Sequence, residues 1–524
     1  MLALPFSIQS FSKLRELNCL YVDKTKYAYD LIIQKQSFFL ARPRRFGKSL
    51  FISTLEEILK GNKDLFEGLY IDKTDYSWEI HGVISLDFAS LDHSNVDSLK
   101  KSLSQALILI AKQQKISIDF DFSNPNSTLI SLVNALHEKF NRVAILIDEY
   151  DHPILQMLYK EHLPDILIVL QSFFAAIKSL DTYIRFLFIT GVSAFAKAGV
   201  FSGMNHPDNI SLDPLFATIC GYTEKEIDDY FTSYLKDLAE KTRLSLGKLR
   251  LEIKNRYNGY HFGKNVQAVY NPFSLIKAIK KESLQNFWFG SGTPTFLIEE
   301  IKKAYTKKAY DVFHLEEFKI GEEEPEYFDA TAIPLPALML QTGYLTIKKF
   351  EEGEYILGFP NLEVKTAMQK HLLSIFINLD FVFTSQLSRD LAKALNHEDV
   401  EKVVFCLQSL FSHIPARLHI QEERFYHSLL QVAFEACGLK ILSEHPFSQG
   451  CIDLILELPS LFYVIEVKFN RSAQEALVQI EENKYYEPFL SEEKNIRLLG
   501  LDFKKETSKQ GKSQFVITFE SKRL

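Results

Sequence analysis

The sequence predicts an α/β protein in which a mainly parallel sheet comes first and a second, smaller α/β domain follows near the C-terminus. Residues 1–214 alternate short apolar runs with helix-length segments, and this alternation is typical of parallel sheets. A loop that ends in Gly-Lys-Ser follows the first apolar run and precedes a helical segment. Two β-rich runs, 451–458 and 461–469, carry acidic residues and a lysine. With 524 residues the chain is long enough for two or three domains, each with its own core.

Four apolar runs are the expected strands of the first sheet. They are residues 37–41, 82–89, 143–150 and 185–191. The third run is apolar without interruption until its final acids, which suits a strand buried on both faces of a parallel sheet. Its charged end is expected at the carboxyl edge of the sheet, beside the loop that ends in Gly-Lys-Ser.

The most informative segment is the octapeptide RPRRFGKS at residues 42–49. A strand, a tight loop ending in Gly-Lys-Ser and a helix form the arrangement that binds nucleotide phosphates. Backbone N–H groups are expected to face the phosphates, Lys48 to reach the β- and γ-phosphates, and the Ser49 hydroxyl to bind Mg²⁺. Arg42 stands where the general motif begins with glycine, and it is expected to add positive charge. The alternative is a basic surface turn before a helix.

The cofactor that this loop predicts is ATP with Mg²⁺, and GTP fits the same motif. Arg44 and Arg45 contact phosphates or DNA in this interpretation, or are simply solvated, and the sequence does not rank these alternatives. The predicted nucleotide contacts of the loop are Arg44, Arg45, Phe46, Gly47, Lys48 and Ser49.

Polar residues at the ends of two further strands complete the predicted nucleotide site. Asp148 is expected to hold the coordination shell of Mg²⁺. Glu149 is expected to polarise the attacking water and is therefore the predicted catalytic carboxylate of ATP hydrolysis. Thr190 and Ser193 lie at the end of the next apolar run, and either one is a candidate for the polar side chain that senses the γ-phosphate in P-loop ATPases. The alternatives are solvated loop acids after a core strand and, for Ser193, a cap on the next helix.

The remainder of the chain divides by pattern. Residues 215–285 turn helical, as expected for a lid on a phosphate-loop domain, and an acidic stretch at 321–328 resembles a joint. Residues 334–343 are expected to be helical and to precede a β-hairpin, which suggests a winged-helix module or a plain linker. The predicted domains are 1–214 (phosphate-loop core), 215–320 (helical lid), 329–412 (helical connector) and 413–524 (C-terminal α/β domain).

The two C-terminal β-rich runs are joined through Pro459 and Ser460 and are expected to form an antiparallel hairpin. A turn centred there places Asp453 opposite Glu466, on one face with Lys468. Directly opposed carboxylates lie about 5 Å apart and repel each other unless a cation bridges them. A divalent metal beside Lys468 resolves that conflict. The alternative is an exposed hairpin whose charges are solvated.

Several longer blocks resemble one known family. The segments LYVDKTKYAYDLI, FFLARPRRFGKS and AILIDEYDHPI are similar to the AAA-ATPase-like family of bacterial proteins, as are YNGYHF, QTGYLT and the C-terminal CIDLILEL and YVIEVKF. The resemblance covers nearly the whole chain. It implies a P-loop NTPase (AAA-like) parallel-sheet domain with a helical lid, followed at 413–524 by a PD-(D/E)xK restriction-endonuclease-like domain.

The resemblance also implies roles for the C-terminal residues. Asp453 and Glu466 would bind Mg²⁺ or Mn²⁺, and Lys468 would orient the nucleophile. Glu423 matches the position of an additional acidic metal ligand, and Gln479 matches a position on the following helix. One departure is the sequence Gly-Cys-Ile-Asp, since the family usually has arginine where this chain has Cys451.

Composition limits the partners and the compartment. The net charge of −7 argues against a broad surface for nucleic acid, whereas residues from 494 onward carry a local net charge of +5 that suits a phosphate backbone or a solvated tail. Five cysteines without a Cys-x-x-Cys pair fit a reducing cytoplasm. The N-terminus has no signal-peptide pattern, and no apolar run has the length of a membrane span.

These observations predict an ATP-binding and ATP-hydrolysing protein coupled to a Mg²⁺-dependent nuclease acting on DNA. The resemblance suggests a role in defence or in mobile-element biology. The alternative is a nucleotide-dependent regulatory or scaffold ATPase whose nuclease-like domain binds without cleaving, and Cys451 favours it. A homo-oligomer is compatible with an AAA-like domain. A DNA translocase is disfavoured by the acidic balance.

Overall fold

The computed structural model describes residues 1–158, 160–194, 207–288, 295–306, 318–326, 334–376, 381–414, 423–447, 450–507 and 513–524. By its internal contacts the chain forms two compact units. The first contains residues 1–304 and 316–361, and the second contains residues 305–315 and 362–524. The boundary after Asn361 falls inside the predicted 329–412 connector. The four-part division is finer than this one and stays a prediction.

A five-stranded sheet forms the centre of the first unit. Its strand order is β2-β3-β4-β1-β5, and every pairing is parallel. The four strands expected from the apolar runs are confirmed within a few residues. The strands are β1 (Ser37–Ala41), β2 (Gly82–Asp87), β3 (Val143–Asp148), β4 (Ile184–Gly191) and β5 (Asp208–Asn209).

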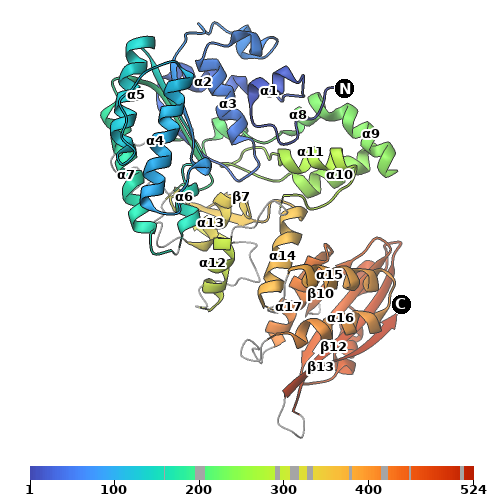
Figure 1. Ribbon diagram of the computed structural model, residues 1–524. Helices are drawn as coiled ribbons and strands as arrows, with labels where there is room; N and C mark the ends of the chain where they lie inside the picture. The colour runs from blue at the N-terminus through green and yellow to red at the C-terminus, as the bar shows by residue number, and fades with distance from the viewer. Residues whose placement is uncertain are drawn as a thin grey trace. The chain divides into compact units, whose positions relative to one another are not determined.

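Helices cover this sheet in two groups. In one group α4, α5 and α7 pack together, and in the other α3 packs with α1 and α2 (Figure 1). β3 is buried at every position, as its uninterrupted apolar sequence predicts. The helices are α1 (Phe11–Glu16), α2 (Thr25–Gln34), α3 (Lys48–Leu59), α4 (Val96–Gln113), α5 (Pro125–Phe140), α6 (His152–Met157) and α7 (Leu163–Ser179).

The predicted lid is helical. Helices α8 (Glu224–Glu226) and α9 (Thr232–Thr242) are continuous through one π-type turn, and α10 (Leu246–Tyr257) and α11 (Pro272–Lys281) follow. They share an apolar core that also takes in Leu20 and Val22 from the N-terminal segment. The core of this helical region is therefore built from two distant parts of the sequence.

The first unit also contains a small antiparallel sheet. The expected hairpin is confirmed as β7 (Thr346–Glu351) and β8 (Glu354–Gly358), and β6 (Phe318–Gly321) pairs with β8. The expected helix before the hairpin is α13 (Leu335–Thr342), and α12 (Thr295–Thr306) precedes β6. The joint predicted at 321–328 is described up to residue 326, where it forms a short helical turn.

The second unit is a five-stranded mixed sheet with helices around it. Its order is β13-β12-β11-β10-β9, in which only the β11–β12 pairing is parallel. The strands are β9 (Lys440–Phe447), β10 (Gly450–Glu457), β11 (Leu461–Phe469), β12 (Asn495–Thr507) and β13 (Ser513–Arg523). The helices are α14 (Leu362–Phe376), α15 (Phe381–Asn396), α16 (Val400–Ser412), α17 (Glu423–Ala436) and α18 (Ala473–Glu482).

The two faces of β11 are covered by different helices. Tyr426 of α17 stacks on Phe469 and Phe503, which point to one face. Leu477 and Ile480 of α18 share a core with Val464 and other residues of the opposite face. The face under α18 is the one that carries Glu466 and Lys468, because side chains alternate along a strand.

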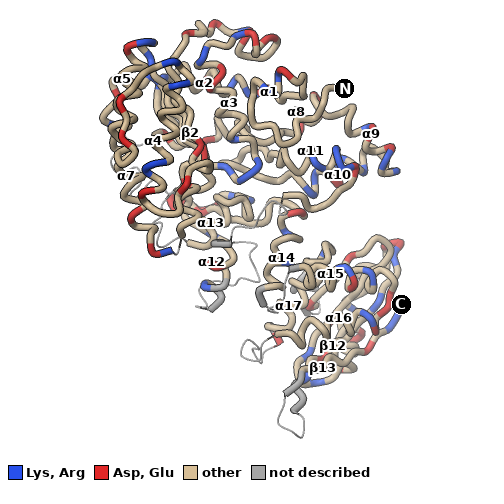
Figure 2. Tube along the Cα trace, in the orientation of Figure 1, with Lys and Arg blue, Asp and Glu red and all other residues tan. Residues whose placement is uncertain are grey.

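Within the described part of the chain, no helix has both the length and the apolar character that crossing a membrane requires. Figure 2 shows Lys and Arg interspersed with Asp and Glu along the trace. This distribution agrees with the acidic net charge of −7.

Candidate functional sites

The phosphate loop connects β1 directly to α3. Helix α3 begins at Lys48, and Gly47 before it has a left-handed conformation with φ 99°. Arg45 is the other left-handed residue of the loop, with φ 70°. The loop therefore turns at Arg45 and Gly47, and it delivers the first N–H groups of a long helix to the carboxyl edge of the sheet.

The expected positive charge of Arg42 is present but buried, because the guanidinium binds backbone carbonyl oxygens. Its side chain is only 1% exposed and donates hydrogen bonds to the carbonyl oxygens of Ala41 (2.9 Å), Ser211 (2.6 Å) and Phe216 (3.0 Å). The guanidinium also lies 4.1 Å from the ring centre of Phe262. Burial lowers the pKa of Arg42 to about 10, so the group stays charged at neutral pH. Arg42 fastens the start of the loop to the chain that follows β5.

Lys48 and Glu149 meet at the mouth of the loop. The Lys48 ammonium lies 3.4 Å from Glu149 Oε1 and donates to the carbonyl oxygens of Arg42 (3.0 Å) and Pro43 (3.3 Å). Glu149 follows β3 in a left-handed conformation, with φ 51°. Burial alone would raise the pKa of Glu149, but the charges of Lys48 and Arg44 outweigh it and lower that pKa. Glu149 is therefore an ionised acid beside the phosphate loop.

Asp148 and Thr190 are joined across neighbouring strand ends. The Thr190 hydroxyl donates a 2.5 Å hydrogen bond to Asp148 Oδ1, which also accepts the N–H of Glu149 at 3.1 Å. Asp148 is 7% exposed and Thr190 is fully buried. Thr190 thus fixes the orientation of the carboxylate that is expected to hold Mg²⁺.

Ser193 forms hydrogen bonds with Asp151 instead of Asp148. Its hydroxyl and its N–H both donate to Asp151, at 2.5 and 2.7 Å, and the N–H of Val192 donates to the same carboxylate. Burial and the neighbouring charge of Glu149 raise the pKa of Asp151 to about 6. Neither Ser193 nor Thr190 lines the cavity described next, so both side chains support the site from behind the acids.

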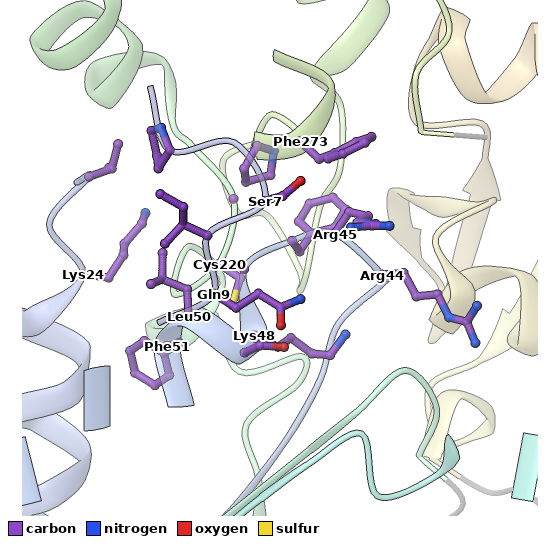
Figure 3. Close-up of a pocket in the computed structure, with 18 of the residues that line it drawn as sticks. Ser7, Gln9, Lys24, Arg44, Arg45, Lys48, Leu50, Phe51, Cys220 and Phe273 are labelled. Atoms are coloured by element: carbon purple, nitrogen blue, oxygen red, sulfur yellow. The ribbon is translucent and has the colours of Figure 1, made fainter. Parts of the chain in front are cut away.

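A cavity of about 410 Å³ lies between the phosphate loop, the N-terminal segment and helix α11. Figure 3 shows Lys48, Arg45 and Gln9 around it, with Phe273 of α11 beyond them. Arg44, Gly47, Ser49, Asp148 and Glu149 also line it. The volume and the mixed polar and apolar lining suit a nucleotide-sized ligand.

Aromatic residues contact the rest of the phosphate loop, through its side chains or its backbone. The Arg45 guanidinium lies 4.9 Å from the ring centre of Phe273. Phe46 is buried and packs edge-on against Tyr260, with the ring centres 4.7 Å apart. The indole N–H of Trp288 donates to the Arg44 carbonyl oxygen at 3.0 Å. Phe46 thus anchors the loop in the core.

Two residues of this site were not predicted from the sequence. Asp87 ends β2, pairs in register with Asp148 and lines the cavity, and burial raises its pKa. His152 lines the cavity with its ring 5.3 Å from that of His93, and burial lowers its pKa. The rule that identified Asp148, an acid at the carboxyl end of an apolar run, applies equally to Asp87.

In the second unit the β10–β11 hairpin has the predicted register. Ile455 pairs with Val464, and the ladder continues to Leu454 and Ile465. Beyond that pair, the carboxylate of Asp453 accepts the backbone N–H of Val467 at 2.8 Å. This hydrogen bond holds the Asp453 carboxylate at the end of β11, where Glu466 and Lys468 lie.

Helix α17 contacts the backbone of Asp453. Nε2 of His427 is 2.9 Å from the Asp453 carbonyl oxygen, and Glu423 lies one turn earlier on the same helix. Burial is the main cause of a raised pKa for Asp453, and the charge of Glu423 contributes to it. Glu423 is therefore within electrostatic reach of Asp453, as the resemblance implies.

Glu466 and Lys468 form a buried pair. The Lys468 ammonium donates to Glu466 Oε1 at 2.8 Å, and both side chains are almost fully buried. The other oxygen, Glu466 Oε2, is buried and has no hydrogen-bond partner among the described residues. Burial and the charge of Asp453 raise the pKa of Glu466 to about 7. Asp453 and Glu466 share one lysine, so the two carboxylates repel each other when both are ionised.

This arrangement fits a divalent cation. A buried carboxylate oxygen without a partner is costly, and a hard cation binds such oxygens. Among the residues that the structure describes, no three His, Cys, Asp or Glu side chains form a ready metal cage. Mg²⁺ is commonly held by one or two carboxylates with water, so Asp453 and Glu466 would be enough to hold such an ion.

The position of α18 depends on a glycine opposite Glu466. Gly500 of β12 pairs with Glu466, and a Cβ there would lie 2.3 Å from the carbonyl oxygen of Ala473 at the start of α18. Gln479 lies half-buried on this helix. Within the described parts of the chain its side chain makes no hydrogen bond, so its predicted role stays a prediction.

Comparison with known proteins matches a family model to each of the two parts of the chain. A family model described as a predicted AAA-ATPase matches residues 5–201, and a model of the PD-(D/E)XK nuclease superfamily matches residues 421–513. A protein of Azotobacter chroococcum mcd 1, named "Uncharacterized protein in vnfD 5′ region", is 33% identical over 521 residues, which is 96% of this chain and 97% of the relative. The chain belongs to the predicted AAA-ATPase family.

Both matched regions contain the residues described above. The AAA-ATPase region includes the phosphate loop and the acids after β3, and the nuclease region includes Glu423, Asp453, Glu466, Lys468 and Gln479. The protein thus combines a P-loop ATPase fold, built on a parallel sheet, with a PD-(D/E)XK nuclease-superfamily domain. Phe273 and Trp288, which hold the phosphate loop, lie outside both regions.

Two solved structures share a weaker likeness. The Aeropyrum pernix ORC1 protein in complex with DNA is 10% identical, with a TM-score of 0.24 over 66% of this chain and 91% of that chain. The Aeropyrum pernix ORC2 protein is 12% identical, with a TM-score of 0.28 over 67% of this chain and 93% of that chain. At these scores the two structures carry no weight in the functional interpretation.

Proposed function

We propose that this AAA-ATPase family protein binds and hydrolyses ATP with Mg²⁺ and cleaves DNA at its C-terminal acidic site in a metal-dependent reaction. The observation that carries the nuclease proposal is Glu466 Oε2, which lies near Asp453 and Lys468 and has no hydrogen-bond partner in the described parts of the chain. The observation that carries the ATPase proposal is the contact of Lys48 with Glu149 beside the phosphate loop.

At the nucleotide site, the chain supplies charge and alignment. Lys48 and the N-terminus of α3 bind the phosphates, and Ser49 and Asp148 would hold Mg²⁺, which neutralises charge on the phosphate oxygens. Glu149 is ionised and orients a water molecule for attack on the γ-phosphate. Thr190 keeps Asp148 in position throughout.

At the C-terminal site, Asp453 and Glu466 would hold Mg²⁺ or Mn²⁺, which supplies Lewis acidity toward a phosphodiester. Lys468 lies 2.8 Å from Glu466 and places a positive charge where negative charge develops on the phosphate. His427 and the N–H of Val467 hold Asp453 by its carbonyl and its carboxylate.

ATP is proposed to regulate the nuclease, because a γ-phosphate and its Mg²⁺ are able to reorder loops that relax after hydrolysis. The alternative function is a regulatory or scaffold ATPase whose nuclease-like domain binds DNA without cutting it. The substitution of cysteine at residue 451 for the usual arginine of the family favours this alternative.

The test is a cleavage assay on purified protein. Linear, supercoiled and single-stranded DNA are incubated with Mg²⁺ or Mn²⁺, with and without ATP. Asp453→Asn keeps an acceptor for the Val467 N–H but removes the charge, and Lys48→Ala disables the phosphate loop. Cleavage that requires metal and Asp453 supports the nuclease, and its dependence on ATP and Lys48 supports coupling. ATP hydrolysis without cleavage of any DNA would favour the scaffold alternative.

A further inference from the structure

A second polar cavity lies at the opposite edge of the parallel sheet. It has a volume of about 360 Å³ and is lined by residues that precede or begin the strands. His81 comes just before β2, Arg142 just before β3, and Arg185 is the second residue of β4. The phosphate loop lies at the carboxyl ends of the same strands. A six-residue strand separates the two edges by roughly 20 Å.

Positive charge at this edge exceeds the acids available to balance it. Arg142 forms an ion pair with Glu79, and the other acid, Asp75, accepts the Tyr29 hydroxyl at 2.7 Å. Arg185 makes no ion pair or hydrogen bond with any described residue. Burial and the neighbouring charge of Arg142 both lower the pKa of Arg185, so the two guanidinium groups repel each other.

A hydroxyl completes the group of donors. Tyr76 Oη is buried and has no hydrogen-bond partner among the described residues. The charges of Arg142 and Arg185 both act on the Tyr76 hydroxyl. Lys35, which lies in a left-handed conformation after α2, contributes a further cation to the lining. His81 adds no charge at neutral pH, because burial lowers its pKa.

The rest of the lining is apolar. Ile33, Leu59 and Phe186 line the same cavity, and Ile33 is 46% exposed. A site with arginines and a hydroxyl on one side and aliphatic and aromatic groups on the other suits a ligand with one anionic group on an apolar body.

We propose that this edge of the sheet is an anion-binding site, separate from the nucleotide site, that binds a terminal phosphate group. Arg142, Arg185 and Tyr76 line one cavity from three different segments, and a tetrahedral phosphate accepts hydrogen bonds from more directions than a planar carboxylate does. An anion here relieves the repulsion between the two arginines and gives the Tyr76 hydroxyl a partner. The source of the phosphate is either a small phosphate ester or the 5′-phosphate end of a nucleic acid.

The experiment uses the full chain with Lys48→Ala, so that the phosphate loop no longer contributes, and EDTA to suppress metal-dependent reactions. Inorganic phosphate is the first probe, and its binding is measured by broadening of its ³¹P NMR signal at increasing protein concentration. Binding is expected to persist in the Lys48→Ala protein and to weaken about tenfold or more when Arg185→Gln is added, since each charge-assisted bond is worth about 1.5–3 kcal/mol. Failure of ATP hydrolysis in the wild type would leave this result unaffected.

Two further variants protect the test from a folding defect. Tyr76→Phe removes only the hydroxyl and is expected to weaken phosphate binding about threefold or more, because it deletes one neutral hydrogen bond. Arg243→Gln, at the exposed end of α9, is the matched control and is expected to leave binding unchanged. Phosphate binding that is absent in the Lys48→Ala protein, or equal in the Arg185→Gln and Arg243→Gln proteins, would overturn the proposal.

The two phosphate sources are then compared. Oligonucleotides with a 5′-phosphate and with a 5′-hydroxyl are titrated into the same proteins. An advantage of the 5′-phosphate that disappears with Arg185→Gln identifies a nucleic-acid end as the ligand. Equal binding of the two oligonucleotides, with phosphate binding still dependent on Arg185, identifies a small phosphate ester.

Discussion

Lys48 Nζ lies 3.4 Å from Glu149 Oε1, so the cation of the phosphate loop and the acid after β3 are direct neighbours. Lys48 is 3% exposed and completes its contacts with two backbone carbonyls of the loop. A phosphate that enters the loop has to compete with Glu149 for this ammonium. The same carboxylate therefore has two effects, since it opposes phosphate binding and is positioned to activate water.

The variant Glu149→Gln separates these two effects. Loss of the general base is expected to lower kcat for ATP hydrolysis by about 10²-fold or more. Loss of the competing charge is expected to tighten ATP binding, because Lys48 is released from its acidic partner. Equilibrium binding of a fluorescent ATP analogue and steady-state hydrolysis test both parts. Weaker ATP binding in Glu149→Gln than in the wild type would contradict the competition.

Thr190 is predicted to act through Asp148. Thr190→Val keeps the shape of the side chain but removes the 2.5 Å hydrogen bond, so the carboxylate loses its orientation. The Mg²⁺ concentration that gives half-maximal ATPase activity is expected to rise about fivefold or more, which corresponds to the loss of one hydrogen bond of about 1 kcal/mol. Thr190→Ser keeps the hydroxyl and is expected to resemble the wild type. An unchanged Mg²⁺ dependence in Thr190→Val would exclude this positioning role.

Arg42 is predicted to contribute to stability. Arg42→Lys keeps the charge but cannot reproduce the fork that reaches Ser211 and Phe216. Buried carbonyls without partners cost about 1–3 kcal/mol each, so the free energy of unfolding is expected to fall by about 3 kcal/mol. Urea titration measures the change. Arg44→Lys, at a half-exposed position of the same loop, is the control and is expected to change stability by less than about 0.5 kcal/mol.

The sequence predicted the strands well because their information is local. β3 is an uninterrupted apolar run that ends in acids, and the carboxyl ends of parallel strands meet at one edge, so Asp148 was found. The hairpin register followed from the short turn at Pro459 and Ser460 and from the alternation of side chains. These features need no knowledge of distant contacts.

The features that were missed depend on contacts between distant segments. Arg42 was expected to add positive charge to the loop, but the sequence did not indicate that its guanidinium binds the carbonyls of Ser211 and Phe216, about 170 positions further along the chain. Phe46 belongs to an aromatic core with Tyr260 for the same reason. No local pattern indicates which of several arginines or aromatic residues will find such partners. Asp87 is different, because the rule used for Asp148 would have found it.

Gly500 is predicted to set the distance between α18 and the acidic site. Gly500→Ala places a Cβ 2.3 Å from the Ala473 carbonyl oxygen, which is backbone and has little freedom to move. The expected cost is about 1–3 kcal/mol in the free energy of unfolding of the second unit, as for other overpacked sites. Gly247→Ala in α10 is the control, since a Cβ there meets no atom within 4 Å. Equal stability of the Gly500→Ala protein and the wild type would mean that α18 shifts freely.

Without metal, the acidic site is predicted to make the stability of the second unit depend on pH. The pKa of Glu466 is raised to about 7 in the folded protein, whereas an exposed glutamate titrates near pH 4.3. A raised pKa means that the folded state binds the proton more tightly than the unfolded state. The contribution of Glu466 to stability is therefore fully present below about pH 4 and is lost as the pH rises to about 7. Glu466→Gln, measured in EDTA by urea titration of the second unit, is expected to remove this part of the pH dependence.

Metal binding favours the deprotonated form of Glu466, because the cation requires the ionised carboxylate and has to displace its proton. Below about pH 7 the affinity for Mn²⁺ is expected to rise about tenfold per pH unit, the slope for release of one proton, and to level off above it. Calorimetric titration in buffers of different ionisation enthalpy counts the released protons directly. Lys440→Gln, at an exposed ion pair with Glu457 on the same sheet, is the control and is expected to keep the slope. A Mn²⁺ affinity that does not change between about pH 5 and pH 7 would show that Glu466 is already ionised or does not bind the metal.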